Sequence, residues 1–151
     1  PYGVNVVGKE FELDFIEKMI YASSDVEVEF EQSLIHSDQL TFDLQLNKLI
    51  AKNNVVFTYQ DMILSSQQLG AFFPNKIFAS QDVQFSYKGY SANANEASYN
   101  LDENVIVLTG SANLSKDEDF FRGEIISFDL NEEKVLSQGR SKVKLSTEKL
   151  P

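Results

Sequence analysis

Apolar and polar residues alternate along four short stretches of the chain. The stretches are DVEVEF at 25–30, NVVFTY at 54–59, DVQFSY at 82–87 and, less regularly, SANLSK at 111–116. A period of two places successive side chains on opposite faces of a strand. Each stretch is therefore predicted to be a half-buried β-strand.

The same columns of this alternation stay apolar from stretch to stretch, which predicts one continuous apolar face. They contain Val26, Val55, Val83 and Ala112; Val28, Phe57, Phe85 and Leu114; and Phe30, Tyr59 and Tyr87, the last interrupted by Lys116. Continued toward the amino terminus with the same parity, the face adds Ile20, Leu49, Ile77 and Ile106, and Ala22, Ala51, Ala79 and Leu108. One column of the opposite face is apolar too, so apolar surface is expected on both sides of the sheet there. It contains Tyr21, Ile50, Phe78 and Val107.

A nine-residue pattern recurs in register with these stretches. It reads LDFIEKMIY at 13–21, FDLQLNKLI at 42–50, YNLDENVIV at 99–107 and FDLNEEKVL at 128–136, with GAFFPNKIF at 70–78 as an altered middle copy. The copies start 28 or 29 residues apart. Each reads as strand, turn, strand. A two-strand repeat cannot bury its apolar face alone, so the copies are expected to stack on one core.

The centre of each copy is predicted to be a hairpin turn. The turn residues include Asn47, Pro74, Asn75, Asp102, Glu103, Asn131 and Glu132. In the first copy, Phe11, Phe15 and Met19 are four residues apart and would also fit a helix. The equivalent segments contain Asn, Asp and Pro, which favour turns, so the hairpin is the interpretation that serves all five copies.

The sequence thus predicts an all-β protein: an elongated, slightly open antiparallel β-jellyroll of about five two-strand repeats, forming a single domain over residues 1–151. A stack that does not close leaves an unpaired strand edge at each end. The candidate edges contain Val4, Val6 and Val7 at the amino end, and Val143 and Leu145 at the carboxy end. Such edges predict end-to-end self-association into filaments.

Composition narrows the possible partners. Hydrophobic residues make up 42% and charged residues 24%, as in folded globular chains. The formal net charge of -10 disfavours nucleic acids and anionic bilayers. The chain has no cysteine, which excludes disulfides and thiolate chemistry, and it has no apolar run of the roughly 18 residues that a membrane helix needs.

Candidate catalytic chemistry is sparse. His36 is the only histidine and is interpreted as a strand-borne polar residue without a catalytic role. Two acidic clusters lack the spacing of a calcium loop, and the first is interpreted as a solvated strand face that discourages edge pairing. They contain Glu27, Glu29 and Glu31, and Asp117, Glu118 and Asp119. No phosphate loop, nucleophile elbow or zinc motif occurs, so no enzyme activity, metal or cofactor is expected.

Two motifs carry a resemblance to a known family. SDQLTFDL, ANEASYNL and GEIISFDL each run into an aromatic residue followed by x–Leu, and VLTGSANL forms a strand–glycine–strand junction. With the repeat spacing, they resemble the LptA/OstA family of periplasmic lipopolysaccharide transport proteins, whose fold is similar to that of LptC and the LptD amino-terminal domain. The resemblance implies a periplasmic carrier, its signal peptide removed, with LptC-like and LptD-like partners.

The resemblance also implies that the apolar columns named above line a groove for the acyl chains of lipid A. The competing hypothesis is a closed β-sandwich that serves as an adhesin or binds protein or carbohydrate. The absence of Trp weakens the carbohydrate version, although 12 Phe and 6 Tyr leave it open.

Overall fold

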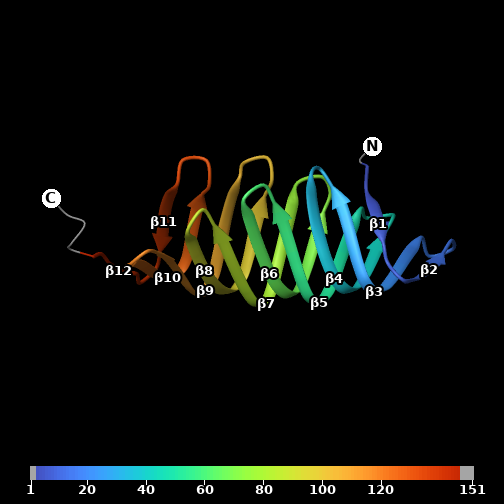
Figure 1. The fold of residues 1–151 in the computed structure, drawn as a ribbon, viewed down its shortest axis with the longest axis horizontal. Helices are drawn as coiled ribbons and strands as arrows, with labels where there is room; N and C mark the ends of the chain where they lie inside the picture. The colour runs from blue at the N-terminus through green and yellow to red at the C-terminus, as the bar shows by residue number, and fades with distance from the viewer. Residues whose placement is uncertain (1–2, 147–151) are drawn as a thin grey trace.

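The computed structural model describes residues 3–146, which form twelve strands of one antiparallel sheet (Figure 1). The strands are β1 (Asn5–Val7), β2 (Glu10–Asp14), β3 (Met19–Phe30), β4 (Ser33–Asp43), β5 (Lys48–Tyr59), β6 (Met62–Phe72), β7 (Lys76–Tyr87), β8 (Tyr90–Asn100), β9 (Val105–Lys116), β10 (Asp119–Asp129), β11 (Lys134–Gln138) and β12 (Lys142–Lys144). The expected all-β, elongated, slightly open architecture is confirmed.

The long strands β3 to β10 follow one another in sheet order, each paired with the next. At the amino-terminal end, β2 pairs with the first half of β3 and β1 with its second half. At the carboxy-terminal end, β12 pairs with the first half of β10 and β11 with its second half. Each end of the sheet is therefore an edge made of two short strands.

All the long strands bend near their middle, where every pairing between them has a register shift. In the odd-numbered strands the bend consists of two successive residues with positive φ. These are Ser24 and Asp25, Asn53 and Asn54, Gln81 and Asp82, and Gly110 and Ser111. Gly, Asn and Asp adopt this backbone at the least steric cost, which accounts for several of these residues.

The bends fold the sheet over into two layers that face each other. Layer A contains the five repeated turns and the strand halves beside them, and layer B contains the other strand halves. Ring contacts join the layers: Phe85 of layer B lies 6.0 Å from Phe128 of layer A. The apolar residues between the layers form one core.

Four of the five repeated turns share one hydrogen-bond pattern. A side-chain oxygen of Asp14, Asp43, Asn100 or Asp129 accepts hydrogen bonds from the backbone N–H groups two and three residues further on. This Asx turn explains why Asp or Asn recurs at the second position of the pattern. The predicted hairpins are confirmed, including the one in the first copy.

The middle turn is one residue shorter than the others. Ala71 pairs with Ile77 as Phe42 pairs with Leu49, so the middle copy starts at Ala71 and not at Gly70. Its turn occupies residues 73–75 and contains a cis peptide bond before Pro74. The sequence alignment was off by one residue before the turn because the deletion lies inside it.

Backbone hydrogen bonds also connect each turn to the next. They run from Leu44 N to Lys18 O (3.0 Å), Phe73 N to Asn47 O (3.2 Å), Leu101 N to Asn75 O (2.8 Å) and Leu130 N to Asn104 O (3.0 Å). The copies are therefore held in line along the long axis of the molecule.

Candidate functional site

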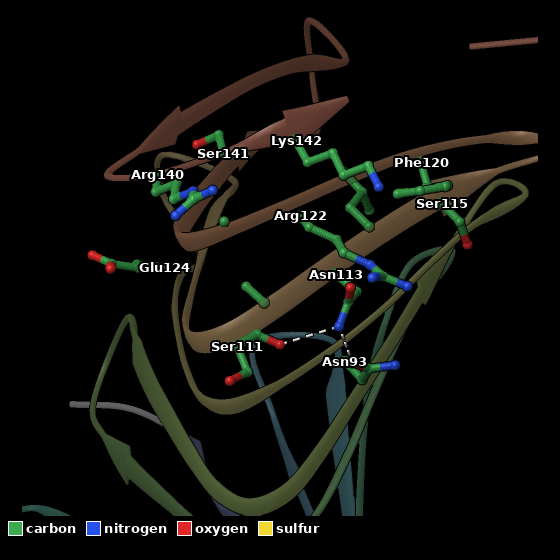
Figure 2. Close-up of a pocket in the computed structure, with 13 residues that line it drawn as sticks. Asn93, Ser111, Asn113, Ser115, Phe120, Arg122, Glu124, Arg140, Ser141 and Lys142 are labelled. Carbon is green, nitrogen blue, oxygen red and sulfur yellow. Dashed lines mark hydrogen bonds between the residues drawn. The ribbon is translucent and has the colours of Figure 1, made fainter. Parts of the chain in front are cut away.

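The outer face of layer B and the interior between the two layers differ in chemistry. A hollow of about 970 Å³ on the outer face of layer B is lined mainly by polar side chains (Figure 2). The interior between the layers is apolar and contains the columns that the sequence predicted as the lipid-binding site.

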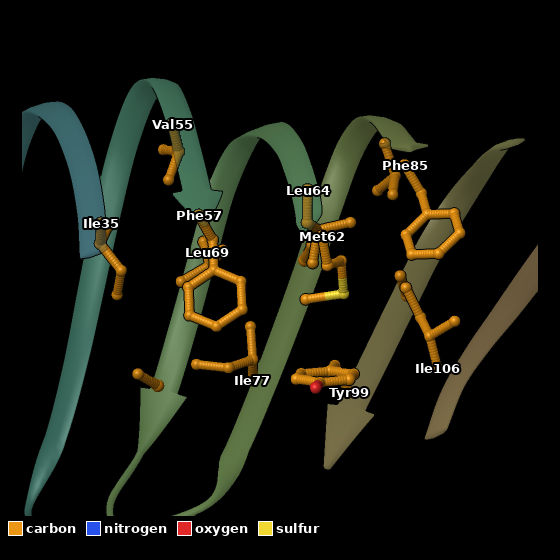
Figure 3. Packing of buried hydrophobic residues seen from close by; sticks show 14 of the residues in the cluster. Ile35, Val55, Phe57, Met62, Leu64, Leu69, Ile77, Phe85, Tyr99 and Ile106 are labelled. Atoms are coloured by element: carbon orange, nitrogen blue, oxygen red, sulfur yellow. The ribbon is translucent and has the colours of Figure 1, made fainter. Parts of the chain in front are cut away.

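Every apolar residue of the five predicted inward columns is buried except Ile20 and Tyr59, which are half-buried and pack against the same core. Figure 3 shows Val55, Phe57 and Phe85 of these columns within the packed interior. The other face also matches its prediction, since Tyr21 and Phe78 are exposed there.

The sequence interpretation missed the even-numbered strands, which contribute a comparable share of the interior. Their largest fully buried side chains include Ile35, Met62, Leu64, Leu69, Tyr99 and Phe128. Serines occupy some inward positions of these strands, so the alternation of apolar and polar residues is interrupted in the sequence. The hydroxyl groups of Ser37 and Ser66 donate to the carbonyl oxygens of Gln39 (3.0 Å) and Gln68 (2.9 Å) across the bends.

The interior is neutral as well as apolar. Among residues 3–146, the buried polar side chains are three serines, and none is charged. Burial raises the pKa of Tyr99, whose hydroxyl donates to Asn104 Oδ1 at 2.5 Å. The hydroxyl of Tyr87 donates to the Leu130 carbonyl oxygen at 3.3 Å. Both hydroxyl groups thus donate to the turns of layer A, and the apolar interior suits an uncharged apolar ligand.

At the amino-terminal end the interior opens into a cavity of about 570 Å³. It is lined by Val4, Val6, Ile20, Phe42, Leu44, Asn47 and Phe73, all apolar except Asn47. The ring of Phe73 stacks on Phe42 at 5.5 Å and lies edge-on to buried Phe30 at 4.7 Å. This amino-terminal mouth therefore leads directly to the core.

At the carboxy-terminal end of the described chain, the last repeated turn packs on the core. Phe128 is fully buried, and its ring packs against those of Phe85, Tyr87 and Tyr90. Leu130 and Leu44 occupy the same position in their turns, yet Leu130 is 2% exposed and Leu44 is 47% exposed.

The residues predicted for the sheet edges lie at the two ends. Val4 and Val6 pack against the core at the mouth, and Val7 points outward, opposite Glu27. Val143 lies in β12 and Leu145 follows it, both about half exposed. The prediction omitted β2 and β11, which complete the two edges.

The polar candidates sit on the outer surface. His36 Nε2 lies 2.7 Å from Asp25 Oδ1, and this hydrogen bond lowers the pKa of Asp25. Glu27 and Glu29 are exposed, as expected of a solvated strand face, but this part of β3 is not a free sheet edge, because β1 pairs with it there. Residues 3–146 contain no group of three His, Asp or Glu side chains that could hold a metal ion. They also contain no helix able to cross a membrane.

Comparison with known protein families assigns the chain to one of them. The family described as "LptA/(LptD N-terminal domain) LPS transport protein" matches residues 34–134, which is more than half of the chain. The chain belongs to this family. The resemblance seen in the sequence is confirmed, and the family is one of lipopolysaccharide transport components.

Among solved structures, this LptA/LptD-family chain is similar to LptH of Pseudomonas aeruginosa, described as the LptA-homologous periplasmic component of the conserved lipopolysaccharide transport device. The TM-score is 0.51 at 14% identity, and the match covers 95% of each chain. At this identity the likeness shows the fold. Comparison with curated protein sequences gave no match.

Proposed function

We propose that this protein is a periplasmic carrier that shelters the acyl chains of lipopolysaccharide in its apolar interior. The observation that carries the proposal is a neutral interior in a member of a lipopolysaccharide transport family. Burying an acyl chain stabilises it by about 0.8 kcal/mol per methylene, so shelter requires no reaction at the protein. The proposed lining consists of the five inward columns and the residues of the even-numbered strands that face them.

In this proposal the acyl chains enter at the amino-terminal mouth, pass Phe42 and Phe73, and reach Phe30. The interior beyond Phe30 is filled by side chains, so a lipid must displace contacts between the layers. Strand pairing runs along the folded sheet, whereas apolar side chains meet between its layers. Acyl methylenes can replace these apolar contacts between side chains with apolar contacts to the lipid. The two layers are therefore expected to separate progressively, starting at the amino-terminal mouth.

We propose that the two ends serve assembly. Phe15 occupies the position of Leu44 in the first turn, where no preceding turn of the described chain can pair with it. Phe15 is 81% exposed and Ile16 is 90% exposed. Large exposed apolar side chains beside a strand edge favour docking of another edge. The proposed partners are a second copy of the chain, and LptC-like and LptD-like proteins, joined end to end.

Photocrosslinking tests the cargo. A photoreactive residue at Phe57 or Phe85, both buried, is expected to capture lipopolysaccharide. The same residue at Glu29 or Thr58, which point outward, is expected to capture little. Thr58 is the matched control because it is the chain neighbour of Phe57. Equal labelling at all four positions would contradict an interior site and favour the closed-sandwich alternative.

A further inference from the structure

The hollow in Figure 2 lies on the face of layer B that points away from the lipid-carrying interior. Ala112, Asn113 and Leu114 of β9 all border it, but the residues Ala112 and Leu114 are almost fully buried and belong to the core, whereas Asn113 is only half-buried. Its other walls come from β10 and from residues 140–142. A ligand here would be separated from the interior by the sheet itself.

Positive charge is concentrated at this hollow. Arg122 and Arg140, the only arginines of the chain, both line it, together with Lys142. Arg122 pairs directly with Lys142 across β10 and β12, where like charges repel. Within residues 3–146, none of the three forms a salt bridge. This arrangement is unexpected in a chain with 23 acidic and 13 basic residues, and an anion would relieve the repulsion.

Glu124 also lines the hollow, but its carboxylate forms no salt bridge with Arg122. It lies against Gly139, where an added Cβ would be 2.6 Å from Glu124 Oε2. In Figure 2 the Glu124 side chain points away from Arg122. The Arg122 guanidinium instead lies 5.0 Å from the Phe120 ring, which holds it in place without cancelling its charge.

Two glycines bring the second arginine close to β10. A Cβ at Gly123 would lie 3.2 Å from Ser141 Oγ, so its absence lets residues 139–141 approach the strand. Gly139 has a φ of 83°, which favours glycine, and its carbonyl oxygen accepts a hydrogen bond from Ser141 Oγ at 3.1 Å. Arg140 is thereby placed beside the hollow by the local backbone.

Uncharged polar side chains extend from this hollow across the outer face of layer B. Asn113 Nδ2 donates to Asn93 Oδ1 at 3.1 Å, and both residues also line a second hollow of about 530 Å³ on the same face. That hollow continues over Ser65, Gln84 and Ser91. Amide and hydroxyl groups on a sheet face can donate to and accept from sugar hydroxyls.

We propose that this outer face binds a phosphorylated saccharide. Arg122, Arg140 and Lys142 hold the phosphate, for which the planar guanidinium is suited by its paired N–H donors. The sugar lies over Asn93 and Asn113. This site is separate from the interior and does not depend on the proposed carrier function.

The test is titration of the protein with glucose 6-phosphate, inorganic phosphate and glucose, followed by calorimetry and by the side-chain amide signals of Asn93 and Asn113. Glucose 6-phosphate is expected to bind best, inorganic phosphate more weakly, and glucose not detectably. Arg122→Gln should weaken glucose 6-phosphate binding about tenfold or more, and Arg122→Lys should weaken it less. Lys134→Gln, which removes one exposed positive charge from β11, is the matched control and should leave binding unchanged.

Thermal unfolding of each variant verifies that it folds, and crosslinking of lipopolysaccharide at Phe57 should be the same in Arg122→Gln and the parent. Failure of glucose 6-phosphate to bind, or equal loss in Arg122→Gln and Lys134→Gln, would overturn the site. Inorganic phosphate binding as tightly as glucose 6-phosphate would overturn the role of the sugar. Binding only to phosphatidylcholine vesicles that contain phosphatidic acid would assign the phosphate to a lipid headgroup and overturn the saccharide proposal.

Discussion

The two ends of the molecule are built from the same repeat and have opposite character. At the amino-terminal end, no earlier repeated turn of the described residues covers the first turn, Phe15 is exposed, and the interior opens into an apolar mouth. At the carboxy-terminal end, Phe128 and Leu130 are buried, and Phe128 packs against rings of β7 and β8. The outer face there is basic, with Arg122 opposite Lys142, whereas Glu27 and Glu29 occupy the outer face at the other end.

The difference follows from how a stack of repeats terminates. Each middle turn is hydrogen-bonded to the turn before it and to the turn after it, whereas the first and last described turns each lack one of these neighbours, so the two ends cannot be equivalent. An asymmetric molecule of this kind has a head and a tail, and contacts between unlike ends propagate instead of closing into a dimer. The same asymmetry gives the proposed acyl-chain path one open end.

The largest effect is expected from one substitution made at both ends. Leu130→Ala should lower the free energy of unfolding by about 2–5 kcal/mol, because it leaves a cavity beside the closed core. Leu44→Ala, at the equivalent exposed position, should cost less than about 1 kcal/mol. Urea unfolding measures both values. Equal losses would show that the two ends are packed alike.

The next effect concerns the carboxy-terminal edge. Val143→Pro removes a strand N–H donor from β12 and restricts the preceding residue, so end-to-end association should weaken about tenfold while the fold survives. Val143→Thr keeps the donor and the branched side chain and is the control. Light scattering over a concentration series measures the oligomers. Identical oligomers in the parent and in Val143→Pro would refute assembly through β12.

A smaller effect is expected at the Asx turns. Asp129→Ala should cost about 1 kcal/mol of unfolding free energy, because two backbone N–H groups of a packed turn lose their acceptor. Asp14→Ala should cost less, because Phe15 beside it is exposed, whereas Leu130 beside Asp129 is buried against the core. Thermal unfolding compares the stability of the two variants. A larger loss of stability for Asp14→Ala than for Asp129→Ala would contradict the conclusion that the last turn is the better packed of the two.

The smallest effect is expected at the single histidine. The pKa of Asp25 is lowered in the folded protein by its hydrogen bond with His36, so the contact stabilises the fold above about pH 4. That contribution is lost as the pH falls through the lowered pKa. The free energy of unfolding of Asp25→Asn should therefore differ slightly from that of the parent near neutral pH and match it in acid, as measured by urea unfolding.

His36→Ala should bind lipopolysaccharide like the parent, because His36 is predicted to have no role in binding. A large loss of binding without unfolding would contradict this prediction.

The repeat and the inward columns could be predicted because a period of two is a local property of the chain. For residues such as Val55 and Phe57, the alternation with their chain neighbours predicts which face of the sheet the side chain lies on. The bends were not predicted, although a continuous strand would place Asn53 on the inward face between Ala51 and Val55, and a polar residue at that inward position marks the bend. The even-numbered strands were missed where buried serines such as Ser66 interrupt the apolar signal.

The ends and the outer site depend on long-range pairing. Strand β12 skips β11 to pair with β10, and only that pairing places Lys142 beside Arg122. Neither residue has a local sequence signal that identifies its partner. The amino-terminal mouth likewise combines Val4 with Phe73, which are far apart in the chain.

The central claim is that acyl chains occupy the interior and enter it from the amino-terminal end. Its most direct test is NMR of methyl-labelled protein with lipopolysaccharide that bears a spin label on an acyl chain. Signal loss should be strong for the inward methyl groups of Ile35 and Leu40, weaker for Ile126, and slight for the outward Leu34 and Ile63. Strong signal loss at Leu34 and Ile63, with unchanged signals from Ile35 and Leu40, would contradict the claim that acyl chains occupy the interior.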